Sequence, residues 1–420
     1  MMKKIYTSID IGSDTIKIVV GESFNGNVNV LASKTIKSKG VRKGLITDPN
    51  LAITAIKDGM LSINDMLGIT IKKVIATVPS YNAKFMYVTG SVNITSPDGF
   101  VTNDDVNRVI KDSIYSKIAQ EYELVTVIPT SFLVDNEEVS SKPVGMQGKK
   151  LDIKGIMITT PKKNIYSVIS VLEGAGLEVV DIAVSGLGDY FEVHNANIDK
   201  KVGAIINIGH ETTTVSVFNH GKLMNTDVIQ LGGYNVEKDI AYIFGISVFD
   251  ARILKERFAS SHKRFSQLND TYEITNNANE KIKLNQLEVT EVVMSRMAQI
   301  LKMAKKQILL LTKHDIGYII ITGGLTEIKS FKNLVFEILG KDVIIFTEET
   351  LGVRDNMYTT SIGLIKYFCD KMESRGRSYS MVDEMDVESL TTPFMDKNKK
   401  DNTTITKIFG NFTKSIKEEK

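Results

Sequence analysis

Residues 9–15 read Ile9-Asp10-Ile11-Gly12-Ser13-Asp14-Thr15, and in the second half of the chain the same frame returns as Ile206-Asn207-Ile208-Gly209-His210-Glu211-Thr212. In each copy alternating apolar residues continue beyond the glycine and lead to a second turn, Asn25-Gly26 in the first and His220-Gly221 in the second. A strand, a tight glycine turn and a second strand make a β-hairpin. The sequence therefore predicts one such hairpin in each half of the chain.

The rest of the chain alternates between strand-like and helix-like patterns. Short apolar runs bounded by Gly or Pro predict strands at 73–78, 153–159, 202–208, 316–322 and 343–346. Helical spacing of apolar residues predicts helices over 51–67 and 286–311. Asn103 is predicted to cap a helix within the otherwise strand-rich stretch 85–160, which favours a separate α+β insert there. The fold class is α/β.

Composition excludes several classes of protein. The 52 Lys and Arg residues nearly balance the 50 Asp and Glu residues, so the net charge of +2 gives no reason to expect a nucleic acid as partner. One Cys cannot form an internal disulfide, and with five scattered His it does not supply a four-ligand zinc site. No stretch has the length of apolar sequence that a membrane-spanning helix needs, and the N-terminus lacks a signal-peptide core. We expect a cytoplasmic protein.

The two glycine hairpins carry groups suited to phosphates. Backbone N–H groups around Gly12 and Ser13, the Ser13 hydroxyl and the Lys17 cation can bind phosphate oxygens, while Asp10 can position a hydrated Mg²⁺. The second hairpin offers Gly209 for close approach and the hydroxyls of Thr212 and Thr213. Two such hairpins facing each other would clamp the phosphates from opposite sides.

A third motif follows a buried strand, where Gly323-Gly324 ends the run 319–322. Paired glycines let a flat base lie against the backbone, although a simple strand-to-helix turn has the same pattern.

These motifs together resemble those of the actin-like, Hsp70-like and sugar-kinase-like ATPase superfamily. The segment 10–17 resembles its first phosphate motif, 207–217 the second, Gly323-Gly324 the adenosine motif, and 357–364 the helix that closes the second half. The resemblance implies two lobes, each a ribonuclease-H-like domain, around a cleft that holds ATP and Mg²⁺, with Asp10 contacting the metal through water. The nucleotide-binding residues it implies are Asp10, Gly12, Ser13, Lys17, Asn207, Gly209, Thr212, Gly232, Gly233, Lys255, Glu256, Gly323 and Gly324, with Lys255 and Glu256 near the ribose.

Within the superfamily, the insert is similar to that of the FtsA family of bacterial cell-division proteins. The segments 101–110, 127–135 and 143–148 resemble the SHS2-like subdomain that FtsA proteins carry in the first lobe. PilM-type pilus-assembly proteins carry a similar insert, so a pilus platform remains an alternative. A small-molecule kinase of the same fold is a second alternative, although it would need a catalytic carboxylate and a polar substrate pocket between the lobes.

The C-terminal segment has the pattern of a membrane-binding helix. Five apolar residues recur at steps of three and four, and three lysines lie among them: Ile405, Lys407, Ile408, Phe409, Phe412, Lys414, Ile416 and Lys417. Such a helix lies in the interface of an anionic membrane. The alternative is that it docks on the protein itself or on a partner, but the long polar stretch before it argues against packing on the protein's own core.

The second phosphate motif departs from the superfamily pattern. Asn207 stands where an Asp is usual, and an amide cannot act as a base toward an attacking water. Glu211 would bring a negative charge toward the γ-phosphate unless it points away. We expect ATP binding with slow or absent hydrolysis.

The predicted domains are the first-lobe core over 1–84 and 161–201, the insert over 85–160, the second lobe over 202–370 with an outer subdomain at about 235–311, a flexible linker over 371–402 and the membrane helix over 403–420. By its resemblance to FtsA, the chain would polymerise on the inner face of the cell membrane at the division septum. There it would hold FtsZ by the FtsZ C-terminal tail, through the outer subdomain, and recruit later division proteins.

Overall fold

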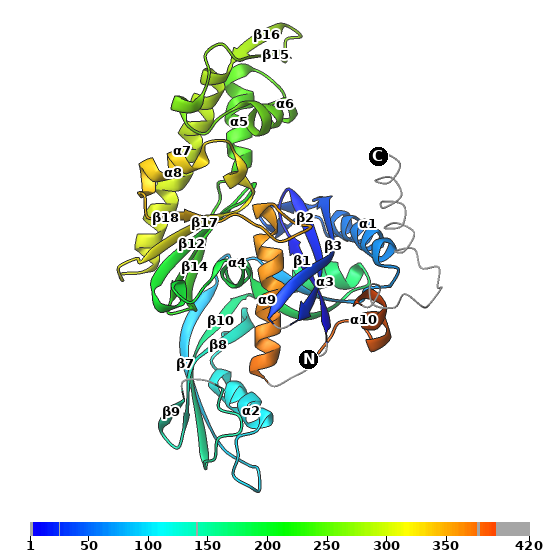
Figure 1. Ribbon diagram of the computed structural model, residues 1–420, viewed down its shortest axis with the longest axis vertical. Helices are drawn as coiled ribbons and strands as arrows, with labels where there is room; N and C mark the ends of the chain where they lie inside the picture. Colours follow the sequence, from blue (N-terminus) through cyan, green and yellow to red (C-terminus); the bar gives the residue numbers. More distant parts are fainter. Residues whose placement is uncertain (1–2, 25, 140–141, 376–378, 392–420) are drawn as a thin grey trace, which may run out of the picture.

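The computed structural model describes residues 3–24, 26–139, 142–375 and 379–391. The described chain forms two lobes, each built around a five-stranded sheet, and a smaller sheet projects from the first lobe (Figure 1). The expectation of an α/β fold with two related halves is confirmed by this arrangement.

The two large sheets have the same plan. In the first lobe the order is β11-β6-β1-β2-β3, and in the second lobe the order β14-β13-β12-β17-β18 mirrors it. Each sheet joins three antiparallel strands to two parallel ones, so β1 and β2 correspond to β12 and β13. The strands are β1 Lys4–Ile11, β2 Thr15–Phe24, β3 Asn27–Lys37, β6 Lys73–Val78, β11 Glu178–Val184, β12 Val202–Ile208, β13 Thr213–Asn219, β14 Lys222–Ile229, β17 Tyr318–Thr322 and β18 Val343–Ile345.

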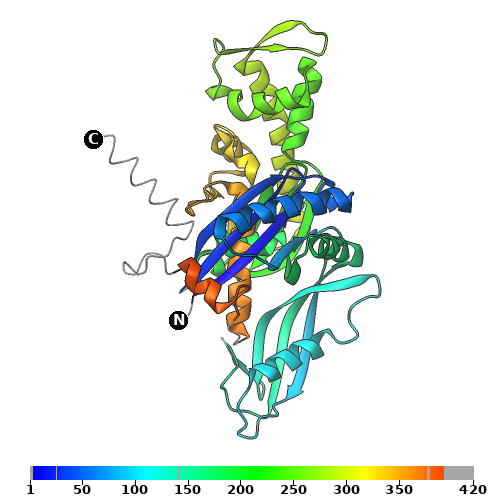
Figure 2. The same cartoon turned by 90° about the vertical axis from the view of Figure 1, so that its right-hand side faces the viewer.

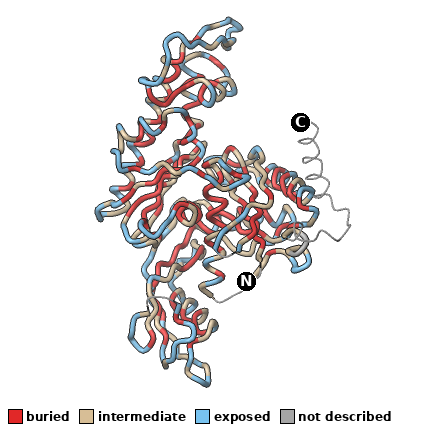
Figure 3. Tube along the Cα trace, in the orientation of Figure 1, coloured by how far each residue is buried: buried red, intermediate tan, exposed pale blue. Residues whose placement is uncertain are grey.

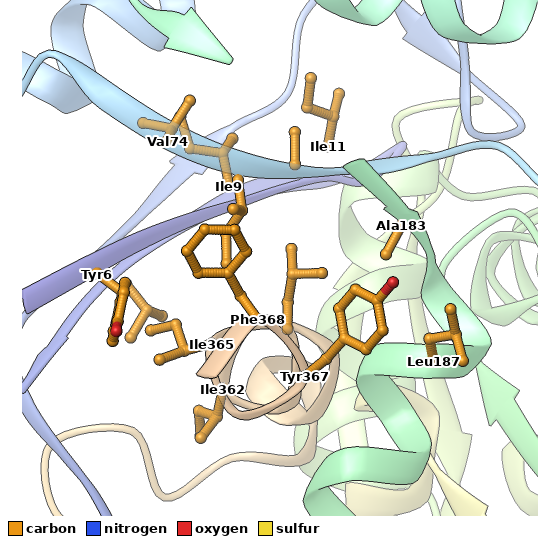
Figure 4. Packing of buried hydrophobic residues seen from close by; sticks show 14 of the residues in the cluster. Tyr6, Ile9, Ile11, Val74, Ala183, Leu187, Ile362, Ile365, Tyr367 and Phe368 are labelled. Atoms are coloured by element: carbon orange, nitrogen blue, oxygen red, sulfur yellow. The ribbon is translucent and has the colours of Figure 1, made fainter. Parts of the chain in front are cut away.

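Helices cover these sheets and cross between the lobes. The helices are α1 Pro49–Leu67, α3 Lys162–Gly174, α4 Ser185–Val193 and α9 Thr359–Ser374, and a short hairpin is formed by β4 Val41–Arg42 and β5 Leu45–Ile46. On α9, Ile362, Ile365 and Phe368 are buried against Tyr6 and Ile9 of β1 (Figure 4). The ring of Phe368 meets that of Tyr6 edge-on, with 5.5 Å between their centroids.

The crossing of α4 and α9 depends on two glycines. A β-carbon at Gly363 would lie 1.8 Å from the carbonyl oxygen of Gly188, and one at Gly188 would lie 2.6 Å from the carbonyl oxygen of Thr360. Only glycine lets the two helices approach this closely. The two helices therefore pack in close contact where the lobes meet.

The insert is a four-stranded sheet of order β7-β10-β8-β9 with one helix against it. Its elements are β7 Lys84–Asn93, α2 Asn103–Ile114, β8 Tyr122–Val134, β9 Glu137–Val139 and β10 Lys150–Pro161. The expectation that Asn103 caps the helix was wrong, because Thr102 is the cap. Thr102 and Asp105 form a reciprocal capping box, which places Asn103 inside the first turn.

The outer part of the second lobe lies at the opposite end of the molecule from the insert (Figure 2). It contains α5 Gly233–Phe244, α6 Val248–Ile253, β15 Thr271–Thr275, β16 Lys281–Asn285 and α7 Gln286–Leu311, while α8 Phe331–Leu339 packs against α7 and β18 of the large sheet. Buried residues run along both large sheets and into this outer part (Figure 3). Among the described residues, no helix has the length and apolar character to cross a membrane.

The prediction of a flexible linker from residue 371 onward needs correction. Helix α9 continues to Ser374, and α10 occupies Glu384–Thr391. Between them Met381 is buried, and its backbone N–H donates to the carbonyl oxygen of Ile5 on β1. The segment carries no periodic pattern because it packs through isolated residues. The predicted membrane helix over 403–420 lies outside the described residues.

Candidate functional site

A cavity of about 620 Å³ lies between the two large sheets. Its volume is in the range of sites that bind cofactors and small ligands. It brings together twelve of the thirteen residues expected to bind nucleotide: Asp10, Gly12, Ser13, Lys17, Asn207, Gly209, Thr212, Gly233, Lys255, Glu256, Gly323 and Gly324. Gly232 lies behind the second hairpin turn, where a β-carbon would be 2.5 Å from the carbonyl oxygen of Gly209.

The first hairpin turn joins β1 to β2. The N–H of Gly12 donates to the carbonyl oxygen of Thr15 at 3.2 Å, which closes the turn. Asp10 and Lys17 face each other across the strands, with 3.4 Å between Lys17 Nζ and Asp10 Oδ2. Thr77 also donates to Asp10 from β6 at 2.9 Å. The turn thus presents a cation and a carboxylate to the cavity.

The second hairpin turn repeats this geometry between β12 and β13. The N–H of Gly209 donates to the carbonyl oxygen of Thr212 at 2.9 Å. Thr213, which the sequence suggested as a second hydroxyl donor, is fully buried and donates to the carbonyl oxygen of Leu231 instead. Its neighbour Thr212 lines the cavity.

Asn207 contacts a carboxylate that the sequence pattern did not reveal. Its Nδ2 donates to Asp189 Oδ1 at 2.9 Å and to Thr360 Oγ1 at 3.1 Å, and Thr360 donates to the same carboxylate oxygen at 2.6 Å. Asp189, on α4, is 1% exposed. Burial raises the pKa of Asp189 to about 7, although the hydrogen bonds from Thr360 and Asn207 act in the opposite direction. An aspartate at position 207 would therefore face another carboxylate.

We expect Asp189→Asn to reduce the dependence of folding stability on pH. A raised carboxyl pKa means that the folded chain keeps a proton that the unfolded chain has lost. The free energy of unfolding therefore falls as pH rises from the unfolded value near 4 toward 7. The pKa rise from 3.8 to about 7 corresponds to at most about 4 kcal/mol.

Urea unfolding of the wild type and of Asp189→Asn at pH 5 and pH 7.5 measures how the free energy of unfolding of each protein changes with pH. Glu192, whose pKa burial also raises to about 7, contributes equally to both and cancels in the comparison. An equal loss of stability in the two proteins would show that Asp189 is not the group that titrates.

Glu211 does not face a phosphate position freely. Its Oε2 accepts the backbone N–H of Lys43 at 2.5 Å, and its Oε1 lies 3.5 Å from Arg42. Both partners belong to the β4–β5 hairpin of the first lobe. These contacts hold the Glu211 carboxylate against the first lobe, at the lining of the cavity.

The third motif faces the remaining side of the cavity. Gly323 has φ +97°, which favours glycine, and a β-carbon there would lie 2.5 Å from Asn207 Oδ1. Gly324 is more open, since a β-carbon would have one neighbour, Met357, at 3.8 Å. Lys255 is buried and pairs with Glu237 at 2.5 Å, so its charge is balanced within the second lobe.

The sequence did not single out Asp189, Glu237, Arg252 or the β4–β5 hairpin as neighbours of the cavity. No three His, Cys, Asp or Glu side chains in the described part of the chain are arranged to hold a metal ion. The proposed Mg²⁺ contact through Asp10 therefore stays a prediction, in which water and the phosphates would supply most ligands.

Two family models match the chain in different places. The model for cell division protein FtsA matches residues 204–363, and the model for the SHS2 domain inserted in FtsA matches residues 82–159. Together they cover more than half of the sequence. The chain belongs to the FtsA family. This membership supports a role in cell division.

Individual relatives of this chain belong to the same family. The cell division protein FtsA of Bacillus subtilis (strain 168) is 28% identical over 377 residues, which are 89% of this chain and 86% of the relative. FtsA of Enterococcus hirae is 27% identical, with 88% and 84% covered.

Solved structures show the same two-lobed actin-like fold. The PilM–PilN type IV pilus biogenesis complex matches with a TM-score of 0.58 and 14% identity, over 86% of this chain and 97% of that chain. MreB5 of Spiroplasma citri bound to ADP matches with a TM-score of 0.52 and 14% identity, over 89% and 98%. Both expectations, the FtsA family and the actin-like fold, are confirmed.

Proposed function

We propose that this FtsA-family chain binds ATP between its lobes, polymerises on the inner face of the cell membrane, and tethers the FtsZ ring there. In this role it would also recruit later division proteins at the septum. The observation that supports nucleotide binding best is that three glycine motifs, far apart in the sequence, meet at one cavity. The MreB5 structure of the same fold holds ADP, which agrees with this proposal.

The cavity offers complementary groups to a nucleotide. Lys17 and the turn at Gly12 would bind phosphates on one side, and the turn at Gly209 would bind them on the other. The open surface at Gly324 leaves room for a base. Mg²⁺, held through water by Asp10, would neutralise phosphate charge when bound.

We propose that hydrolysis is slow. The amide of Asn207 cannot accept a proton from water, and its Nδ2 is engaged by Asp189. Asn207→Asp would place a second carboxylate beside Asp189, and the two would compete for a shared proton. Asn207→Asp should leave single-turnover hydrolysis as slow as in the wild type.

An open groove of about 1,090 Å³ between α7 and α8 is our candidate site for the FtsZ tail. Four lysines outnumber two glutamates in its lining, and five apolar residues lie among them: Lys263, Glu291, Met294, Ala298, Lys302, Met303, Lys305, Lys306, Leu334, Glu337 and Ile338. A groove with this mixture fits a peptide that carries both acidic and apolar side chains. Part of the groove belongs to α8 and so lies beyond the outer subdomain expected at about 235–311.

Charge reversal in this groove should weaken binding of an FtsZ C-terminal tail peptide. Lys302 and Lys306 are exposed and lie one turn apart on α7. The double change Lys302→Glu and Lys306→Glu should lower the affinity at least about tenfold, because like charges across an interface repel. Fluorescence anisotropy of a labelled tail peptide measures it.

The matched control for the groove is the exposed pair Lys162 and Lys163 on α3 of the first lobe. Lys162→Glu with Lys163→Glu changes the net charge equally and should leave the affinity unchanged. Equal weakening by both double variants would mean that the net charge, rather than the groove, determines binding.

The tethering function itself is tested by co-pelleting FtsZ with anionic liposomes. FtsZ should pellet with the liposomes only when this chain is present. If this chain pellets with liposomes but retains a PilN-type peptide rather than FtsZ, the pilus-platform alternative is supported. Brisk phosphotransfer from ATP to sugars would instead support the kinase alternative.

A further inference from the structure

The duplicated hairpins place an acid at the same position in each half. Asp14 follows Gly12 by two residues, and Glu211 follows Gly209 by two residues. Both side chains are buried, at 9% and 7% exposure, although both residues line the cavity. Burial of two carboxylates beside a candidate phosphate site requires partners.

Asp14, in the first lobe, binds a cation from the second lobe. Arg252 of α6 donates from two nitrogens to the two carboxylate oxygens, each at 2.8 Å. Lys37 of β3 also donates to Asp14, and His210 Nε2 of the second turn lies 3.8 Å from Asp14 Oδ1. Burial alone would raise the pKa of Asp14, but Arg252 and Lys37 outweigh it and hold the pKa well below its usual range.

Glu211, in the second lobe, binds groups of the first lobe. The β4–β5 hairpin supplies the N–H of Lys43 and the guanidinium of Arg42. The tip of this hairpin contacts both lobes elsewhere too, because Gly44 N–H donates to Ser13 Oγ at 2.7 Å and Lys43 Nζ donates to Gln230 Oε1 at 2.8 Å. The hairpin is thus fastened across the cavity.

We propose that the contacts of Asp14 with Arg252 and of Glu211 with Arg42 and Lys43 are reciprocal clasps that hold the lobes closed and set how slowly a bound nucleotide leaves. The nucleotide part of this inference rests on the proposed function. Each clasp joins an acid of one lobe to a base of the other, so separation of the lobes about the α4–α9 crossing would break both. Asp14 and Glu211 are therefore positioning residues that act through the geometry of the cleft.

The charge of these two carboxylates, taken alone, predicts the opposite effect of their removal on the rate of nucleotide release. Removing a carboxylate beside phosphate oxygens lowers repulsion, which by itself would slow nucleotide release. Loss of a clasp would accelerate release, since charge-assisted bidentate contacts stabilise the closed lobes. The direction of the change therefore separates the two effects.

The experiment follows release of a fluorescent ATP analogue from the full chain after excess ATP is added. Asp14→Asn and Glu211→Gln should each accelerate release about tenfold, which corresponds to roughly 1.4 kcal/mol per clasp, and the double variant should be faster than either. Arg252→Gln should accelerate release as Asp14→Asn does, with no further gain when the two are combined. Release that is unchanged or slower in both single variants would overturn the proposal.

A control pair lies within one lobe. Asp239 and Arg296 form a similar bidentate contact inside the outer part of the second lobe, with side chains 27% and 26% exposed. Asp239→Asn removes an equivalent carboxylate without crossing the cavity, and release should stay at the wild-type rate. Acceleration by this control equal to that by Asp14→Asn would show a general loss of stability and contradict the clasps.

A measurement without nucleotide separates this inference from the proposed function. Spin labels at the exposed positions Leu61 of α1 and Tyr242 of α5 report the distance between the lobes, in a Cys369→Ser background. The double variant Asp14→Asn with Glu211→Gln should give a longer and broader distance distribution than the parent. If the parent does not bind nucleotide, the proposed function fails, but the distances still test whether the clasps hold the lobes closed. An unchanged distance distribution in the double variant would overturn the clasps.

Discussion

Removing residues 403–420 should release the protein from anionic liposomes almost completely while leaving the fold intact. The segment carries one apolar stripe with two Phe and three Ile, and its lysines would be attracted to anionic lipid. The cut lies beyond Thr391, the last described residue, so it removes none of the described packing contacts. Liposome co-pelleting measures binding, and thermal unfolding checks the fold.

A point substitution should reproduce the effect of the truncation. Phe412→Glu puts a charge into the apolar stripe, whereas Asn411→Glu puts the same charge outside that stripe. The first change should lower pelleting at least about tenfold and the second only slightly. If the truncated protein pellets as well as the intact one, the membrane contact is made by another part of the chain.

The second large effect is expected at the cavity. Gly324→Leu should abolish binding of ATP, because the backbone has room for a side chain there and that side chain would fill the space assigned to the base. Lys17→Ala should weaken binding about tenfold or more, since it removes a charge-assisted contact to phosphate. It also removes the cation that lies 3.4 Å from the Asp10 carboxylate, which keeps the hydrogen bond from Thr77.

Equilibrium titration with a fluorescent ATP analogue measures both variants. Lys34→Ala is a suitable control, because Lys34 lies on β3 opposite Ile18 of β2 and is not part of the cavity lining. Wild-type affinity in both Gly324→Leu and Lys17→Ala would place the nucleotide outside this cavity.

The internal repeat allowed much of the fold to be predicted. The frame shared by the segments at Gly12 and Gly209 predicted two equivalent hairpins, and the structure gives them equivalent strands and the same turn hydrogen bond. Glycine motifs are visible in sequence because backbone geometry restricts the residue type locally. The insert was visible for a similar reason, since a helix pattern interrupts a strand-rich stretch.

The partners of the site residues were not predictable in the same way. Asp189 reaches Asn207 only because α4 crosses α9 at Gly188 and Gly363, and that crossing is a property of the folded lobes. Arg252 meets Asp14 across the cavity from a position 238 residues away in the sequence. The burial of Met381 after α9 was missed because a single residue that packs on β1 leaves no periodic pattern.

Hydrogen–deuterium exchange of the full chain with and without ATP and Mg²⁺ tests the central claim most directly. We expect ATP to slow exchange together in three separate segments, 9–15, 206–214 and 322–326, because their backbone groups would close around one ligand. Exchange at β15 and β16, at the far end of the second lobe, should change little. Unchanged exchange in all three segments at saturating ATP, or slowing confined to other parts of the chain, would contradict a nucleotide site between the lobes.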